Sequence, residues 1–320
     1  MTKTNAWRLV ALLFALTLQV ANAEPPQATR MEPISVHDAG EVLQGAVWLP
    51  PGASLAAPGV GSRWPLVVMS HGGGGTLDGH EVLAAALAQA GFVVAAVNHA
   101  GDTAGDESRV LELWRRPHQL HRLVDYMLGE WLGHERIDPA RIGAFGFSNG
   151  GFTVLVAAGG VPRLAAITPY CRTHPAHDLC SALQQAGVDP ASIAEPPASV
   201  WTVDRRIKAI VAAAPAFGFA FDRAGLQHVE IPVQLWGGAD DRHQPAPFYE
   251  DAVRNALPGE PEFHRVESAG HYAFLSPCPP ALAAICTDQP GFDRAAFHHR
   301  FNREVVAFFQ RTLKKNEGKE

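Results

Sequence analysis

Short apolar runs alternate with amphipathic segments along this chain, a pattern typical of a mostly parallel sheet covered by helices. Six apolar runs rich in β-branched residues predict strands at 65–70, 92–99, 141–148, 207–215, 231–238 and 262–268. Residues 79–91 predict a helix that ends at Gly91. Two further helices are predicted from apolar faces at helical spacing, formed by Leu123, Val124, Met127, Leu128 and Trp131 and by Phe297, Phe301, Val305, Phe308 and Phe309.

The rest of the pattern predicts one domain with an insertion. Residues 33–50 predict an antiparallel hairpin that turns near Ala39 and Gly40. We find no internal repeat and no linker, so residues 24–320 are expected to form a single α/β domain. The segment from about 159 to 204 contains Pro, His and two Cys and is too long for a plain connection. We expect it to form a cap-like insertion over the carboxyl ends of the strands, where such sheets bind ligands.

The first 23 residues have the pattern of a secretory signal peptide. Lys3 and Arg8 precede an apolar run from Leu9 to Val20, which is followed by Ala21, Asn22 and Ala23. The run is shorter than the roughly 20 residues that span a bilayer. We therefore expect cleavage after Ala23, no stable membrane anchor, and a periplasmic or secreted protein.

Composition and charge narrow the class of protein. The chain is 47% hydrophobic and 18% charged, so it can bury a sizeable core. Its formal net charge of −6 becomes −8 when Lys3 and Arg8 are removed with the leader. A negative balance of this size argues against nucleic acid or an anionic membrane surface as the main partner.

All four cysteines lie in the part expected to be exported. They form two close pairs, nine and eight residues apart, and an even count in an oxidising compartment favours disulfides. We predict the pairs Cys171–Cys180 and Cys278–Cys286, each closing one local loop. The spacing is not the CxxC of a zinc or redox site, so we expect no metal there.

Gly146-Phe147-Ser148-Asn149-Gly150 matches G-x-S-x-G between the strand predicted at 141–148 and a helix predicted at 150–160. In such a tight turn, side chains at the flanking positions would collide, and glycines let the serine hydroxyl project into the open. The alternative is an ordinary small residue at the end of a buried strand. The strand-turn-helix setting favours Ser148 as a nucleophile.

A serine nucleophile needs a base and an acid that orients the base. Asp240 and Asp241 follow the strand at 231–238, and His271 follows the strand at 262–268. Both turns are expected on the edge of the sheet where Ser148 would lie. We predict His271 as the base rather than nearby His243, and Asp241 as the acid, because it stands between Gly238 and Pro245; Asp240 is then a solvated turn residue.

Acyl transfer also needs N–H donors for the developing oxyanion. The segment SHGGGG follows the first central strand, and we assign the N–H groups of Gly73 and Asn149, with Gly72 or Gly74 as alternatives to Gly73. A phosphate-binding loop is excluded because no Lys-Ser/Thr follows the glycines. His pairs at 118 and 121 and at 174 and 177 have ligand-like spacing, but without HExxH or surrounding carboxylates we expect no catalytic metal.

Six segments together carry a resemblance: PLVVMSHGGGG, FVVAAVNHAGDT, RIGAFGFSNGGFT, IKAIVAAAPAFG, LWGGADDRHQP and AGHYAFLSPC. Over about residues 30–315 the chain resembles the exported dienelactone-hydrolase-like branch of the α/β-hydrolases, close to bacterial proteins similar to platelet-activating-factor acetylhydrolase. The resemblance implies an α/β-hydrolase sheet and hydrolysis of carboxylic esters through Ser148, Asp241 and His271, without a cofactor.

Two departures limit what the resemblance implies. Dienelactone hydrolase itself has a Cys nucleophile where this chain has Ser148, so its lactone substrate is not carried over. The animal acetylhydrolase takes its acid from the end of the preceding strand, where this chain reads AAAPAFG. Asp241 instead matches the GxxxDxxxP bracket of bacterial cutinase-like polyester hydrolases, with Gly237 and Pro245. Phospholipid specificity therefore does not follow from the resemblance.

The sequence thus predicts a serine ester hydrolase that acts through an acyl-enzyme on a small-molecule, lipid or polymer ester. Two alternatives stay open. A peptidase of the prolyl-oligopeptidase type would share the same three residues, and a binding protein could use a hydrolase scaffold without catalysis.

Overall fold

The computed structural model describes residues 29–53, 55, 63–276 and 285–313. Within them, an eight-stranded sheet has the order β1-β2-β4-β3-β5-β6-β7-β8. Its strands are β1 Arg30–Asp38, β2 Glu41–Leu49, β3 Trp64–Ser70, β4 Val93–Val97, β5 Ile137–Phe147, β6 Ile207–Ala213, β7 Val233–Gly238 and β8 Glu262–Val266. The predicted hairpin is the antiparallel pair β1–β2, which joins β4 antiparallel, and the strands from β4 to β8 pair in parallel. The predicted α/β class is therefore confirmed.

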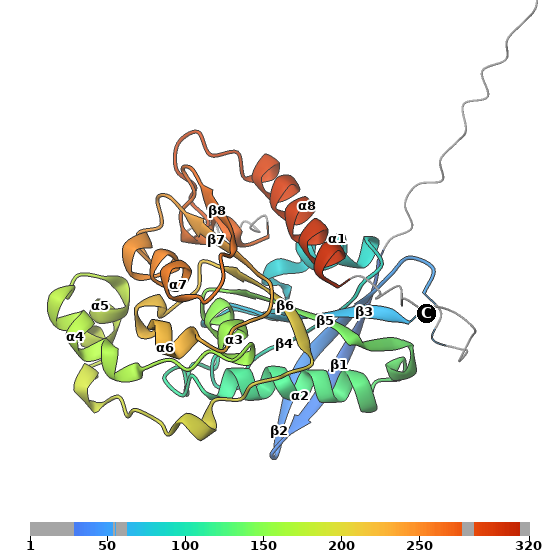
Figure 1. Cartoon of the computed structure of the whole chain (residues 1–320), viewed down its shortest axis with the longest axis horizontal. Coiled ribbons are helices and arrows are strands. Elements are labelled where there is room, and N and C mark those ends of the chain that lie inside the picture. The colour runs from blue at the N-terminus through green and yellow to red at the C-terminus, as the bar shows by residue number, and fades with distance from the viewer. Residues whose placement is uncertain (1–28, 54, 56–62, 277–284, 314–320) are drawn as a thin grey trace, which may run out of the picture.

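Helices cover both faces of the sheet (Figure 1). α1 Glu81–Gln89 and α8 Arg294–Thr312 pack together on one face, while α2 Arg115–Gly129 and α3 Asn149–Ala157 pack together on the other. The remaining helices are α4 Ile167–Thr173, α5 Asp178–Gln185, α6 Arg223–Leu226 and α7 Glu250–Ala256. Each face has its own cluster of buried apolar side chains. Strands between two such layers must be apolar on both sides, which explains their continuous apolar runs.

The predicted apolar helix faces are buried, with one difference in length. All five predicted residues of the α8 face are buried, as are Leu123, Val124 and Met127 of α2. Trp131 is also buried but lies beyond the end of α2 at Gly129. The helix ends early because the Trp131 N–H turns back to the Tyr126 carbonyl oxygen, at 2.8 Å.

The segment at 159–204, which reads as irregular, contains two short helices, α4 and α5. Figure 1 shows these two helices together at one end of the molecule, on the side of α6 and α7. A disulfide between Cys171 and Cys180 joins α4 to α5, so the first predicted pair is present. Cys278 lies outside the described residues, and the second pair stays a prediction.

The N-terminal prediction is not tested by the fold, because residues 1–23 lie outside the described residues. Among the helices that are described, none is long and apolar enough to cross a membrane.

Candidate active site

Ser148 lies in the sharp turn between β5 and α3, with φ 56° and ψ −118°. A positive φ is uncommon for a residue with a side chain and stores strain that the surrounding structure must support. That support includes a hydrogen bond from the Ser148 N–H to the Ala213 carbonyl oxygen of β6, at 2.9 Å. The turn therefore has the conformation expected of a nucleophile elbow.

The two glycines that flank Ser148 are required by backbone packing. A Cβ added at Gly146 would lie 2.0 Å from the carbonyl oxygen of Gly150. A Cβ added at Gly150 would lie 1.9 Å from the carbonyl oxygen of Ser70, at the end of β3. Neither neighbour is a side chain that can turn away, so only glycine fits at these two positions.

The three predicted side chains meet at the carboxyl edge of the sheet. Ser148 Oγ lies 3.1 Å from His271 Nε2, and His271 Nδ1 lies 2.7 Å from Asp241 Oδ2. All three residues are buried, while Asp240 is exposed. Their loops meet because each follows the carboxyl end of a strand in one parallel block, β5, β7 or β8. The arrangement can transfer a proton from Ser148 to His271 and orient the imidazole ring through Asp241.

Gln244 is a site residue that the sequence reading missed. Its N–H donates to Asp241 Oδ1 at 2.8 Å. Its amide nitrogen donates to the carbonyl oxygens of Ala214 and Pro215, which places its amide oxygen 3.1 Å from Ser148 Oγ, as an alternative acceptor to His271 Nε2 for the single hydroxyl proton. The available signal was its place three residues after Asp241, in a loop already assigned to the site.

The glycine loop after β3 lies against the elbow. A Cβ at Gly72 would touch Ser148 Cβ at 3.4 Å, and one at Gly73 would lie 2.6 Å from Asn149 Nδ2. The Gly74 N–H already donates to Asp102 Oδ1 at 2.8 Å, and the Gly75 N–H to the Gly72 carbonyl oxygen at 3.1 Å. Gly74 is therefore not an available oxyanion donor, and the candidates narrow to Gly72, Gly73 and Asn149. Asn149 opens α3, where the N–H groups of the first turn have no partner within the helix.

A cavity of about 280 Å³ lies beside His271 and Asn149. Its other lining residues include apolar and aromatic side chains from α5 and from the loops around the site: Leu179, Ala182, Ala216, Phe217, Tyr249 and Tyr272. The Asp178 carboxylate of α5 contacts His243 Nδ1, and both residues line the same cavity. The 159–204 segment thus contributes directly to the cavity next to Ser148.

Four aromatic residues of the strands and loops around the site divide clearly between the cavity and the core. Tyr272 lines the cavity. Trp201, Trp236 and Phe274 are at most 5% exposed and belong to the core clusters. Trp236 stacks on His264 with ring centroids 4.0 Å apart. These three residues therefore pack in the core and do not line the cavity.

Two acidic groups near the cavity have shifted pKa values. Burial, followed by the neighbouring Tyr170, raises the pKa of Tyr249 well above its usual 10. Burial raises the pKa of Glu250 to about 7, and the nearby Asp241 adds to the shift. Glu250 packs against the end of β7, just before the loop that contains Asp241, since a Cβ added at Gly237 would lie 2.5 Å from Glu250 Oε1. The raised pKa values favour the neutral form of both side chains, which avoids a second negative charge beside Asp241.

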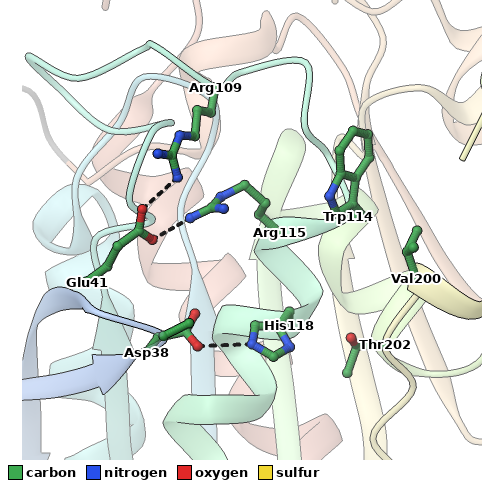
Figure 2. Close-up of a pocket in the computed structure, with 9 residues that line it drawn as sticks. Asp38, Glu41, Arg109, Trp114, Arg115, His118, Val200 and Thr202 are labelled. Atoms are coloured by element: carbon green, nitrogen blue, oxygen red, sulfur yellow. Dashed lines mark hydrogen bonds and ion pairs between the residues drawn. The ribbon is translucent and has the colours of Figure 1, made fainter. Parts of the chain in front are cut away.

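A larger cavity, of about 410 Å³, lies away from Ser148, beside the β1–β2 turn and the start of α2 (Figure 2). Its charged side chains are already paired with each other. Glu41 bridges Arg109 and Arg115, and Asp38 accepts from His118 at 3.0 Å.

The histidines with ligand-like spacing make other contacts. His121 pairs with Asp204 at 2.9 Å, while His174 and His177 stack on each other. Across the described residues, no group of three or more His, Cys, Asp or Glu is arranged to hold a metal ion.

Part of the chain matches a known protein family. Residues 41–112 match the family model described as platelet-activating factor acetylhydrolase, isoform II. Comparison with the curated proteins gave no match.

Three solved structures are similar to the whole domain. A dienelactone hydrolase from Anabaena variabilis ATCC 29413 is 17% identical, with a TM-score of 0.55 over 90% of this chain and 100% of its own. An acylaminoacyl peptidase from Pyrococcus horikoshii is 15% identical, with a TM-score of 0.56 over 92% of this chain. An acylaminoacyl peptidase in complex with Z-Gly-Gly-Phe-chloromethyl ketone is 15% identical, with a TM-score of 0.57 over 92% of this chain. This chain spans only 43% of the length of either peptidase. The chain therefore has the α/β-hydrolase fold, similar as a whole to dienelactone hydrolase and, over residues 41–112, to the acetylhydrolase family.

Proposed function

We propose that the protein hydrolyses carboxylic esters through an acyl-enzyme on Ser148. The observation that carries the proposal is the continuous hydrogen-bonded line from Ser148 Oγ to His271, 3.1 Å, and from His271 to Asp241, 2.7 Å. The line begins on a strained elbow and lies beside a cavity with an apolar wall. A serine hydroxyl that is hydrogen-bonded to a His–Asp pair and lies beside a cavity is typical of nucleophilic catalysis.

The proposed reaction has two halves. His271 Nε2 takes the Ser148 proton as Oγ bonds to the ester carbonyl carbon, and the carbonyl oxygen becomes negative. Gly73 and Asn149 N–H groups donate to that oxygen, and Asp241 stabilises the imidazolium. When the intermediate collapses, the bond to the alcohol oxygen breaks and His271 gives its proton to the departing alcohol. A water, deprotonated by His271, then attacks the acyl carbon; as the bond from that carbon to Oγ breaks and the acid leaves, His271 returns the proton to Ser148 Oγ.

An ester is the favoured substrate class. The names of two similar groups, dienelactone hydrolase and an acetylhydrolase, describe the cleavage of an ester. The cavity is at the small end of the ~300–1,000 Å³ usual for ligand sites, which suits a small acyl or alcohol group. The two acylaminoacyl peptidases keep a peptidase as the second candidate, since their fold is equally similar.

Covalent labelling tests the nucleophile. We expect a fluorophosphonate probe to label the wild-type protein once, and Ser148→Ala to lose both labelling and hydrolysis of p-nitrophenyl esters. Full ester hydrolysis by Ser148→Ala would overturn the proposal, and absence of any labelling would favour a binding protein. A panel of p-nitrophenyl esters and peptide anilides separates esterase from peptidase, with faster ester turnover expected.

We also propose that the protein is exported. The Cys171–Cys180 disulfide supports an oxidising compartment. Mass spectrometry of the protein purified from its own host is expected to give Glu24 as the first residue, and an intact Met1 in an otherwise folded protein would contradict cleavage.

A further inference from the structure

The Asp102 carboxylate lies behind the elbow and contacts both sides of the proposed oxyanion site. It is 3% exposed and belongs to the turn after β4, far in sequence from Ser148. Its Oδ1 accepts from the Gly74 N–H at 2.8 Å, and its Oδ2 accepts from Asn149 Nδ2 at 3.2 Å. One carboxylate thus links the glycine loop to the residue that follows the nucleophile.

Arg116 of α2 completes the link. It is 2% exposed, and its Nη1 donates to Asp102 Oδ2 at 2.6 Å. Its Nη2 donates to the His71 carbonyl oxygen, at the start of the glycine loop. Its Nε donates to Thr153 Oγ1 at 3.2 Å, and Thr153 donates in turn to the Asn149 carbonyl oxygen at 2.7 Å. Arg116 therefore contacts the same two segments as Asp102.

We propose that Asp102 and Arg116 are positioning residues that fix the separation of the Gly73 and Asn149 N–H groups. The inference rests on the proposed ester hydrolysis, because only an oxyanion site needs these two groups at one distance. Hydrogen bonds from a buried ion pair set direction and distance, which apolar packing of the same volume does not. Stability alone does not account for a buried ion pair, since a protein in which apolar side chains of similar volume replace such a pair is often equally stable.

The pair predicts a specific kinetic defect. Asn149→Ala removes one contact of Asp102 and leaves the ion pair and the Asn149 N–H in place. Asp102→Asn removes the negative charge that holds Arg116. A displacement of about 1 Å in a catalytic group can cost roughly 10²-fold in rate. We expect each variant to lower kcat about 10- to 100-fold, with KM changed less than about threefold.

Asp204 provides a matched control. It is also 3% exposed, and both of its carboxylate oxygens accept from Arg206, at 2.8 and 2.6 Å. It precedes the amino end of β6, at the opposite edge of the sheet from Ser148. Asp204→Asn should lower the melting temperature as Asp102→Asn does and leave kcat unchanged.

A double variant and an exchange measurement complete the test. Since the Asn149 amide acts through its contact with Asp102, the variant that combines both substitutions should lose little more kcat than Asp102→Asn alone. Hydrogen exchange of the 71–75 peptide should accelerate in Asp102→Asn, because the Gly74 N–H loses its carboxylate acceptor, and not in Asp204→Asn, and this readout does not need ester turnover. A wild-type protein that does not hydrolyse esters would therefore overturn the proposed function. Unchanged hydrogen exchange of the 71–75 peptide in Asp102→Asn would overturn the positioning role. Wild-type kcat in Asn149→Ala, a loss confined to KM, or an equal kcat loss in Asp204→Asn would also overturn it.

Discussion

Asp240 and Asp241 are adjacent in the chain but differ completely in surroundings. Asp241 is buried and accepts from His271 and from the Gln244 N–H, whereas Asp240 is exposed. The turn after β7 directs only the second carboxylate toward Ser148. The two residues therefore form a natural pair for testing which carboxylate orients the base.

Asp241→Asn is expected to lower kcat roughly 10³- to 10⁴-fold, because a neutral amide neither fixes the tautomer nor stabilises the imidazolium. Asp240→Asn should retain at least half of the wild-type kcat. Steady-state hydrolysis of p-nitrophenyl butyrate checks both, and equal losses in the two variants would refute the assignment of Asp241.

Some residues of the site were predictable from sequence and others were not. Ser148, Asp241 and His271 follow strands, and the ends of strands can be found from apolar runs. Gln244 and Asp102 also follow strands but belong to no recognisable catalytic motif, and Arg116 lies on a helix face. Burial of a charged side chain depends on a partner distant in sequence, and Arg116 pairs with Asp102 only after α2 packs against the turn beyond β4.

At the scale of elements, the contact between β3 and α3 is set by backbone atoms. Gly150 lies against the Ser70 carbonyl oxygen, so the first turn of α3 approaches the end of β3 without any side chain between them. By contrast, Gly129 at the end of α2 is exposed, and a Cβ there would meet nothing within 4 Å.

Gly150→Ala should destabilise the protein by about 3 kcal/mol or more, because the two elements must separate. Gly129→Ala should stabilise it by about 0.5–1 kcal/mol, through the higher helix propensity of alanine. Urea unfolding measures both. A Gly150→Ala variant as stable as the wild type would contradict the close approach of β3 and α3.

The elements themselves followed from sequence better than their connections. The predicted strands and the closing helix are confirmed, because apolar runs of strand length and five apolar residues of α8 leave little ambiguity. The helices α4 and α5 were not predicted, since Pro169, Pro175 and short length obscure their periodicity. Their disulfide was predicted, because it needs only two nearby cysteines.

At the scale of the whole molecule, buried titratable groups give stability a pH dependence. Burial lowers the pKa of His71 and His80 to about 3 and that of His298 to about 4. Unfolded histidines titrate near 6.5, so this contribution to stability is present above pH 6.5 and is lost as the pH falls toward 3. Glu250 acts oppositely, because its pKa rises from 4.5 to about 7 on folding. Its contribution is present below pH 4.5 and is lost as the pH rises through 7.

We therefore expect the free energy of unfolding to rise with pH up to about 6.5, since three histidines outweigh one glutamate. Glu250→Gln should raise it by about 3 kcal/mol above pH 7 and change it little below pH 4.5. Denaturant unfolding between pH 4 and 8 measures both effects. A constant difference between Glu250→Gln and wild type at every pH would show that Glu250 is ionised in the folded protein.

The position of β8 at the edge of the sheet has a consequence for how the protein is made. His271 follows this strand, which is the last of the eight along the chain and pairs only with β7 among the described strands. A growing polypeptide that already carries Ser148 and Asp241 still has no base beside its hydroxyl. Under the proposed mechanism, the chain therefore gains hydrolytic activity only when its final strand has docked.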